Sequence, residues 1–245
     1  MELELSAVEK TLEAVKREAE PSKWSSLMNI KGVIHRNKGE FKEAESAFIG
    51  ALYVDDVMLK CKILINYAMT EVLKKDASRA LQVIDRLFEL IKANKKLQLN
   101  RYTGYAHLLK GQLYHLKKDE KPALAEYMKA EFFFEVAADA RGVGLSCLEV
   151  ARIHIKSRNL TTAWNFLRKA ESYLSRLGDE EKFGVAICKA TALYYSNKAD
   201  EAMAIMNSAY REMGEESDYR YVIDEVLDAY LDNRWRMAQS QQSLT

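Results

Sequence analysis

One spacing of small and large residues, which recurs along the chain, limits the fold more than any other feature of this sequence. Between Ser25 and Met58, small residues stand at Gly32, Ala44 and Ala51, and larger ones at His35, Phe41 and Phe48. This spacing is typical of two helices joined through a loop at Gly39, because small residues let helices approach and large ones fill the space that remains. The stretch therefore predicts one antiparallel helix pair over about 23–37 and 40–55.

Four weaker copies of this pattern follow. They share a small residue in the first helix, an alanine early in the second helix, and a larger residue four positions after that alanine. The matching positions are Ala68, Ala80, Ile84 and Leu87; Gly111, Tyr114, Ala123, Tyr127 and Ala130; Ala151, His154, Ala163, Leu167 and Ala170; and Ala190, Leu193, Ala202, Met206 and Ala209. The early alanine falls at 44, 80, 123, 163 and 202, so the steps are 36, 43, 40 and 39 residues. A period of roughly 40 residues is in the range of helical solenoids.

The rest of the chain supplies one further helix at each end. Over residues 3–20, Leu5, Val8 and Leu12 recur at the spacing of one helix face, and Pro21 marks the end of that helix. Residues 218–237 have an apolar side and an acidic side, as expected of a helix that closes the last exposed surface of a stack; pairing with a second chain is the alternative. We predict one all-α solenoid domain over 1–245, comprising an N-terminal helix (1–22), five helix pairs (23–216), a capping helix (217–237) and a tail (238–245).

Composition and charge narrow the class of protein. Two prolines and ten glycines leave little turn chemistry for a sheet protein, whereas good helix formers dominate. Lys plus Arg is 37 and Asp plus Glu is 36, so no nucleic acid partner is expected. The cations cluster over 92–121 and the acids over 200–232, which we interpret as solvated helix faces. Opposite patches that steer head-to-tail association are the alternative interpretation.

Cysteine usage and the N-terminus indicate a cytoplasmic protein. Cys61, Cys147 and Cys188 are far apart and set among apolar neighbours, which is typical of reduced, buried thiols. The N-terminal residues lack the basic and apolar regions of a signal peptide, and no apolar run is long enough to span a membrane.

The sequence shows no arrangement of residues that predicts catalysis. His107 and His115 are eight residues apart, which is about 12 Å along a helix and too far for two ligands of one metal. His35 and His154 stand at packing positions. Neither a zinc-protease motif nor a nucleophile elbow nor a glycine-rich phosphate loop is present. We therefore expect no enzyme activity, no metal and no cofactor.

The stretch KGVIHRNKGEFKEAESAFIGAL resembles a tetratricopeptide repeat at Gly32, Gly39, Phe41, Ala44, Phe48 and Ala51, with His35 where that family often has tyrosine. Five copies in register cover roughly residues 25–216. The period and loops such as DARGVG are similar to the longer-repeat branch, which includes the kinesin light chains and peptide-sensing Rap-type regulators. The resemblance implies a right-handed superhelix whose first helices line a concave groove, where a peptide or protein partner binds.

The best-known ligand site of that family is a clamp of Lys, Asn and Arg side chains that holds the carboxylate at a chaperone's C-terminus. Asn66 stands at one clamp position. Asn29 and Val33 replace the first-repeat Lys and Asn, and Tyr105 and Leu109 replace the third-repeat Lys and Arg. Chaperone-tail binding is therefore not the expected function.

If the first helices line a groove, a mixed polar and aromatic set of side chains should face it. These candidate partner-binding residues are Asn29, Arg36, Lys62, Asn66, Tyr105, Gln112, Glu149, Arg152, Lys156, Thr191 and Tyr195. We predict an interaction scaffold that holds a protein or peptide segment, of unidentified sequence, in this groove. Two alternatives remain: a peptide-sensing regulatory protein, and a structural subunit that self-assembles as a homo-oligomer through its terminal helices.

Overall fold

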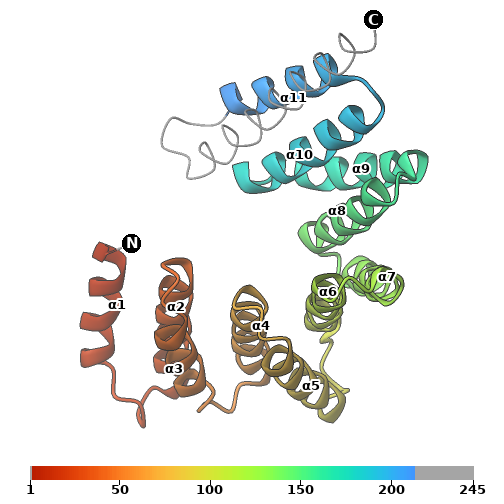
Figure 1. Ribbon diagram of the computed structural model, residues 1–245. Helices are drawn as coiled ribbons and strands as arrows, with labels where there is room; N and C mark the ends of the chain where they lie inside the picture. Colours follow the sequence, from red (N-terminus) through yellow and green to blue (C-terminus); the bar gives the residue numbers. More distant parts are fainter. Residues whose placement is uncertain (1, 213–245) are drawn as a thin grey trace, which may run out of the picture. The chain divides into compact units, whose positions relative to one another are not determined.

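The computed structural model describes residues 2–212, apart from the side chains of residues 179 and 180, and shows an all-α protein (Figure 1). Within this range there are eleven helices and no strand. The helices are α1 (Glu2–Ala14), α2 (Pro21–Asn37), α3 (Phe41–Ala51), α4 (Val57–Leu73), α5 (Ala77–Ala93), α6 (Asn100–Leu116), α7 (Glu120–Val136), α8 (Ala140–Lys156), α9 (Leu160–Leu174), α10 (Asp179–Tyr195) and α11 (Ala199–Glu212). None of these helices is long and apolar enough to cross a membrane.

The helices pack as consecutive pairs, within two compact units. Unit 1 is Met1–Ala137 and unit 2 is Ala138–Thr245. Unit 1 contains α1 and the pairs α2–α3, α4–α5 and α6–α7; unit 2 contains α8–α9 and α10–α11. Within each unit, the first helix of a later pair contacts both helices of the pair before it, as α4 contacts α2 and α3, and α10 contacts α8 and α9. A single continuous domain over residues 1–245 stays a prediction.

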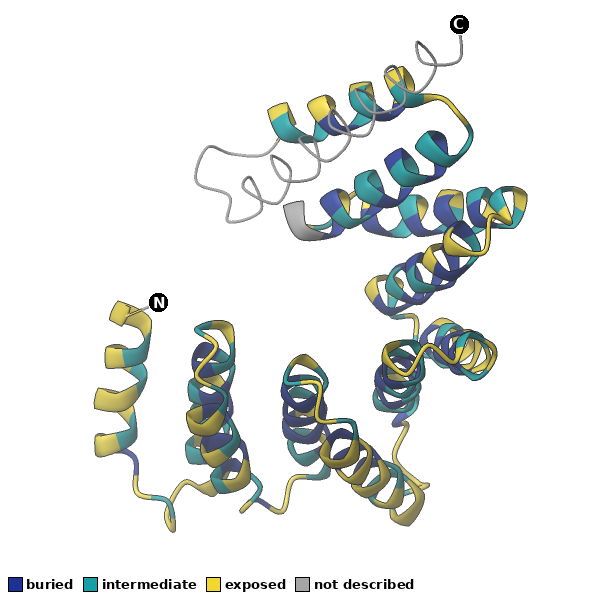
Figure 2. Cartoon of the chain, viewed as in Figure 1, coloured by how far each residue is buried: buried dark blue, intermediate teal, exposed yellow. Residues whose placement is uncertain are grey.

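Most residues of the repeated spacing are buried between the helices of their pair. In the second helices, the early alanines and the larger residues that follow them are buried at all five positions. Figure 2 shows that buried and exposed residues alternate along the paired helices, so that each of these helices has a covered side and an open side. The glycines show how closely the paired helices approach. A Cβ atom built on Gly32 would lie 2.6 Å from Cε1 of Phe48, and one built on Gly111 would lie 2.5 Å from Cε1 of Tyr127. Since real side chains do not approach that closely, glycine is required opposite each ring.

The turn inside each pair has the same backbone conformation. The residue seven positions after the first helix's small residue has a positive φ in all five pairs: 77° at Gly39, and 61° at Lys75, Lys118, Arg158 and Asn197. This left-handed conformation ends the first helix and reverses the chain. Glycine adopts it without strain, so only the first pair has the residue type that the turn favours.

The N-terminal region differs from the predicted arrangement. The first helix ends at Ala14 rather than near residue 20, and Pro21 begins α2 instead of marking the end of α1. Proline is well placed in the first turn of a helix, because the N–H that it lacks would have no partner there. The residue before α2 is Glu20, and Ser22 lies inside the helix. The predicted capping helix and tail lie outside the described residues.

Candidate binding site

In unit 1, the predicted groove residues Asn29 and Asn66 bind each other. The Asn66 side-chain amide donates a hydrogen bond to Asn29 Oδ1 at 2.9 Å. Asn29 is buried, and Asn66 is half-buried. The bond joins α2 to α4, so these two side chains hold neighbouring first helices together.

The other four predicted residues of unit 1 are more accessible. Arg36 is half-buried, and its guanidinium donates to the Met69 sulfur at 3.3 Å, again between α2 and α4. The Tyr105 ring packs edge-on against Phe134, with 4.8 Å between the ring centroids. Lys62 is exposed and Gln112 is half-buried. The structure therefore brings Asn29 and Asn66 into contact, whereas Tyr105 and Gln112 lie on α6.

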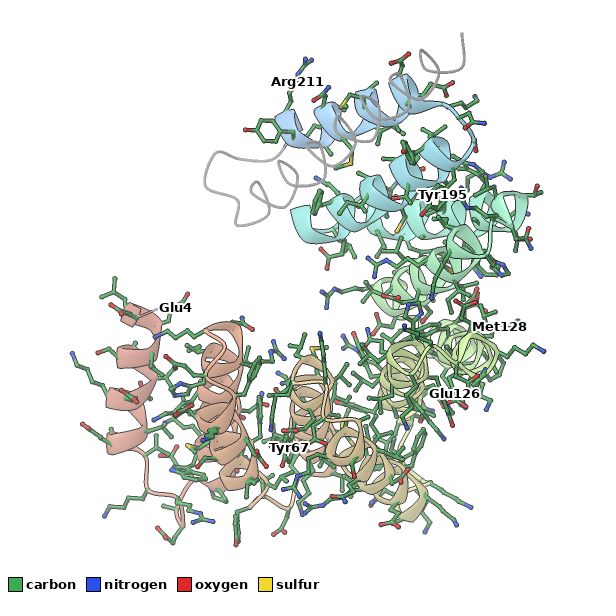
Figure 3. All side chains as sticks on the ribbon, viewed as in Figure 1. Glu4, Tyr67, Glu126, Met128, Tyr195 and Arg211 are labelled. Atoms are coloured by element: carbon green, nitrogen blue, oxygen red, sulfur yellow. The ribbon has the colours of Figure 1, made fainter. Side chains whose placement is uncertain are left out.

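A polar network fixes the second helix of the first pair to the second pair. The hydroxyl of Tyr67, which is labelled in Figure 3, donates to Glu45 Oε1 at 2.7 Å, and Arg79 Nε donates to the Tyr67 oxygen at 3.0 Å. Burial, with Glu45 beside it, raises the pKa of Tyr67 to about 12, so its hydroxyl keeps the proton at neutral pH. These hydrogen bonds connect α3, α4 and α5, so the network has a structural role in holding the first two helix pairs together.

In unit 2, four of the five predicted residues line one small cleft between α8 and α10. Arg152 and Lys156 come from α8, and Thr191 and Tyr195 from α10. Ile155, Ile187 and Cys188 supply the remaining walls, and the volume is about 190 Å³. We call this the α8–α10 cleft. Because ligand pockets for small molecules usually start near 300 Å³, its size suits a single side chain of a peptide.

The charges at the α8–α10 cleft are arranged by short contacts. Arg152 donates to Glu149 Oε1 at 2.7 Å, which brings the fifth predicted residue to the edge of the cleft. The Arg158 guanidinium lies 3.5 Å from the centroid of the Tyr195 ring, in cation–π geometry. Burial raises the pKa of the Cys188 thiol, although a hydrogen bond with Arg152 acts in the opposite direction. A buried, protonated thiol is a wall of the cleft and no nucleophile.

A second and larger cleft in unit 2 was not predicted from the sequence. It has a volume of about 410 Å³ and lies where α9, α10 and α11 meet. Phe183, Val185, Ala186, Ile205 and Ala209 form its apolar part, and Glu171, Ser175, Lys182, Lys189, Ser208 and Glu212 its polar part. We call it the α9–α11 cleft. The sequence did carry a signal for it, since Ala186 is a small residue at a position where other pairs have larger ones.

In the third pair, His107 stands at the position that corresponds to Ala186, four residues before the small residue of the first helix. The His107 ring stacks on Phe133 with 5.4 Å between centroids, and packs edge-on against Phe88 at 5.0 Å. Its Nδ1 is 2.6 Å from Glu126 Oε2, and Lys129 Nζ is 2.9 Å from Glu126 Oε1. Burial lowers the pKa of His107. For Glu126, the opposing effect of burial is outweighed by the hydrogen bonds from His107 and Lys129, which lower its pKa.

The histidines are otherwise structural where their contacts are described. His35 Nδ1 is 2.6 Å from Glu40 Oε2 across the turn of the first pair, and the His154 ring stacks on Phe166. Across residues 2–212, no group of three or more His, Cys, Asp or Glu side chains is placed to hold a metal ion.

Comparison with known proteins gives information about the fold only. No protein-family model matches the chain, and no curated protein matches it either. Among solved structures, the crystal structure of BtubC (BKLC) from P. vanneervenii is similar, with a TM-score of 0.68 and 14% sequence identity. The similarity covers 86% of this chain and 89% of BtubC. At this identity the match supports a shared all-helical architecture.

Proposed function

We propose that this protein is an interaction scaffold of the tetratricopeptide-repeat type, in which right-handed stacking of helix pairs presents the first helices to a protein or peptide partner. The observation that carries the proposal is the α8–α10 cleft. One cavity between consecutive first helices is lined by four residues that were predicted to bind a partner because of their repeat position: Arg152, Lys156, Thr191 and Tyr195. Arginine and tyrosine are also the residue types that anchor many interfaces.

The mechanism is the capture of a peptide side chain by a preformed cavity. The walls formed by Ile155 and Ile187 are apolar, and the edge carries Arg152 and Lys156. Helix packing holds both first helices in place before the partner arrives, so little conformational entropy is lost on binding. The cavity therefore favours a side chain with an apolar stem, from a segment that lies across α8 and α10. Reduced, buried cysteines make the cytoplasm the compartment that we propose.

The test is selection of peptides that bind the full chain from a displayed random library, followed by affinity measurement on variants. Arg152→Ala removes a side chain of the cleft, and we expect the selected peptides to bind it roughly tenfold or more weakly, the loss of one good interface anchor. Arg176→Ala is the matched control, because Arg176 is an exposed arginine that lines neither cleft. Equal affinity of the two variants would remove the α8–α10 cleft as the binding site. Circular dichroism checks that both variants keep the helical content of the native chain.

A further inference from the structure

The α9–α11 cleft occupies a position that other helix pairs fill with a side chain of their own. The position is four residues before the small residue of each first helix: Met28, Leu64, His107, Cys147 and Ala186 in the five pairs. Alanine is the smallest of these five side chains. Ala186 lines the cleft, so the missing side-chain volume coincides with the cavity.

The first pair shows how this space is filled when the side chains are larger. A Cβ atom built on Gly50 would lie 3.2 Å from Cε of Met28 and 3.6 Å from the Trp24 ring. Gly50 corresponds to Ser208, and Trp24 corresponds to Lys182, both of which line the α9–α11 cleft. The last pair therefore has a short side chain and a flexible, charged one where the first pair has Met28 and Trp24.

The third pair shows that an aromatic ring fits the space. His107 lies there between Phe88 of the preceding pair and Phe133 of its own pair. By repeat position, Glu171 corresponds to Phe88 and Glu212 to Phe133, and both glutamates line the α9–α11 cleft. The last pair thus has an open space where the third pair has the His107 ring. It has two glutamates, which are hydrogen-bond acceptors, where the third pair has the two aromatic neighbours of that ring.

We propose that the α9–α11 cleft binds a tryptophan side chain supplied by a partner protein. Its apolar part, with Phe183, Ala186 and Ile205, covers the faces of a ring, and the carboxylates of Glu171 and Glu212 accept a hydrogen bond from the indole N–H. Both carboxylates are held in place, Glu171 by Lys189 Nζ at 2.8 Å and Glu212 by the Ser208 hydroxyl at 3.0 Å. The volume of about 410 Å³ lies within the usual range of ligand pockets.

This site is independent of the proposed function at the α8–α10 cleft. Lys182, Ala186 and Lys189 form one face of α10, whereas Ile187, Thr191 and Tyr195 form another. A partner could therefore use either cleft alone. The Arg152→Ala measurement reports on the α8–α10 cleft and leaves the α9–α11 cleft unaltered, so failure of one proposal is distinguishable from failure of the other.

The test uses N-acetyl-tryptophanamide as the probe, with N-acetyl-phenylalaninamide and N-acetyl-leucinamide for comparison, titrated into the full chain and followed by ligand-observed NMR. We expect the tryptophan probe to bind most tightly. Ala186→Phe fills the cleft with a ring and should weaken its binding roughly tenfold or more, while thermal stability is kept or raised. Ala204→Phe is the matched control, since Ala204 is exposed on α11 and outside the cleft. Glu212→Gln should reduce the preference for tryptophan over phenylalanine.

Three results would overturn the proposal. One is equal binding of all three probes to the native chain, and another is native-like binding by Ala186→Phe. The third is a native chain that binds no probe until Trp235, which stands in the sequence of the predicted C-terminal helix (218–237), is replaced by alanine. The chain's own C-terminal segment would then be the occupant.

Discussion

The first and last helix pairs, α2–α3 and α10–α11, use the same positions for helix contact but place different side chains there. In α2–α3 a glycine, Gly32, faces a large ring, Phe48, whereas α10–α11 has Ala190 and Met206. Both contacts are buried, because a larger residue on one helix is matched by a smaller one on the other. The comparison teaches that the fold depends on the combined volume of each pair of residues more than on either residue alone.

The largest expected effect on stability comes from truncating the larger residue of a helix contact. Phe48→Ala should lower the free energy of unfolding by about 3–5 kcal/mol, because Phe48 is fully buried and its ring fills the space over Gly32. Met206→Ala should cost less, toward the lower end of about 2–5 kcal/mol, since the α9–α11 cleft lies beside α11 and lets the neighbours relax. Chemical denaturation of both variants measures the difference. A greater loss for Met206→Ala would contradict this account of the two pairs.

A smaller effect on stability is expected from enlarging the smaller residue of a helix contact. Gly32→Ala should destabilise the protein by about 1–3 kcal/mol, although alanine is the better helix former, because its Cβ meets the Phe48 ring. The double variant Gly32→Ala/Phe48→Leu reproduces the Ala151 and Leu167 combination of α8–α9. We expect it to be more stable than Gly32→Ala alone, and a thermodynamic double-mutant cycle gives the coupling. Purely additive effects on the free energy of unfolding would show that residues 32 and 48 do not interact, which would contradict the proposed matching of volumes.

The smallest effect is expected at the turn within each pair. Gly39→Ala should cost about 1 kcal/mol, since φ is 77° there and a Cβ is unfavourable in the left-handed region. Asn197→Gly should stabilise the last pair by less than about 1 kcal/mol, because asparagine already tolerates its φ of 61°. Thermal unfolding of the two variants should shift in opposite directions. Shifts of the same sign would show that backbone conformation is not what distinguishes these turns.

The helix pairs could be predicted from the sequence because their contacts are coded at fixed intervals. The five early alanines and the larger residues four positions later are buried as predicted. The end of α1 was predicted wrongly. The apolar spacing that begins with Leu5 continues past Ala14 in the sequence, and Pro21 suits both the end of one helix and the first turn of the next.

The candidate site was predictable only in part. Repeat position identified Arg152, Lys156, Thr191 and Tyr195, because equivalent positions of successive first helices face the same side of a stack. It could not show that the Asn66 side chain donates to Asn29, since that contact joins residues 37 positions apart in two different helices. Nor could it show that Ile187 and Cys188 complete the α8–α10 cleft.

The sequence by itself therefore determined the number of helix pairs between residues 21 and 212, and the residues at which each pair makes its closest contact. Those properties depend on helical periodicity and on the matching of volumes between two residues at a constant separation. Only the tertiary structure decided where cavities remain. A cavity depends on side chains from three helices at once, as at Glu171, Ala186 and Ser208, and a small residue leaves space only when its neighbours do not fill it.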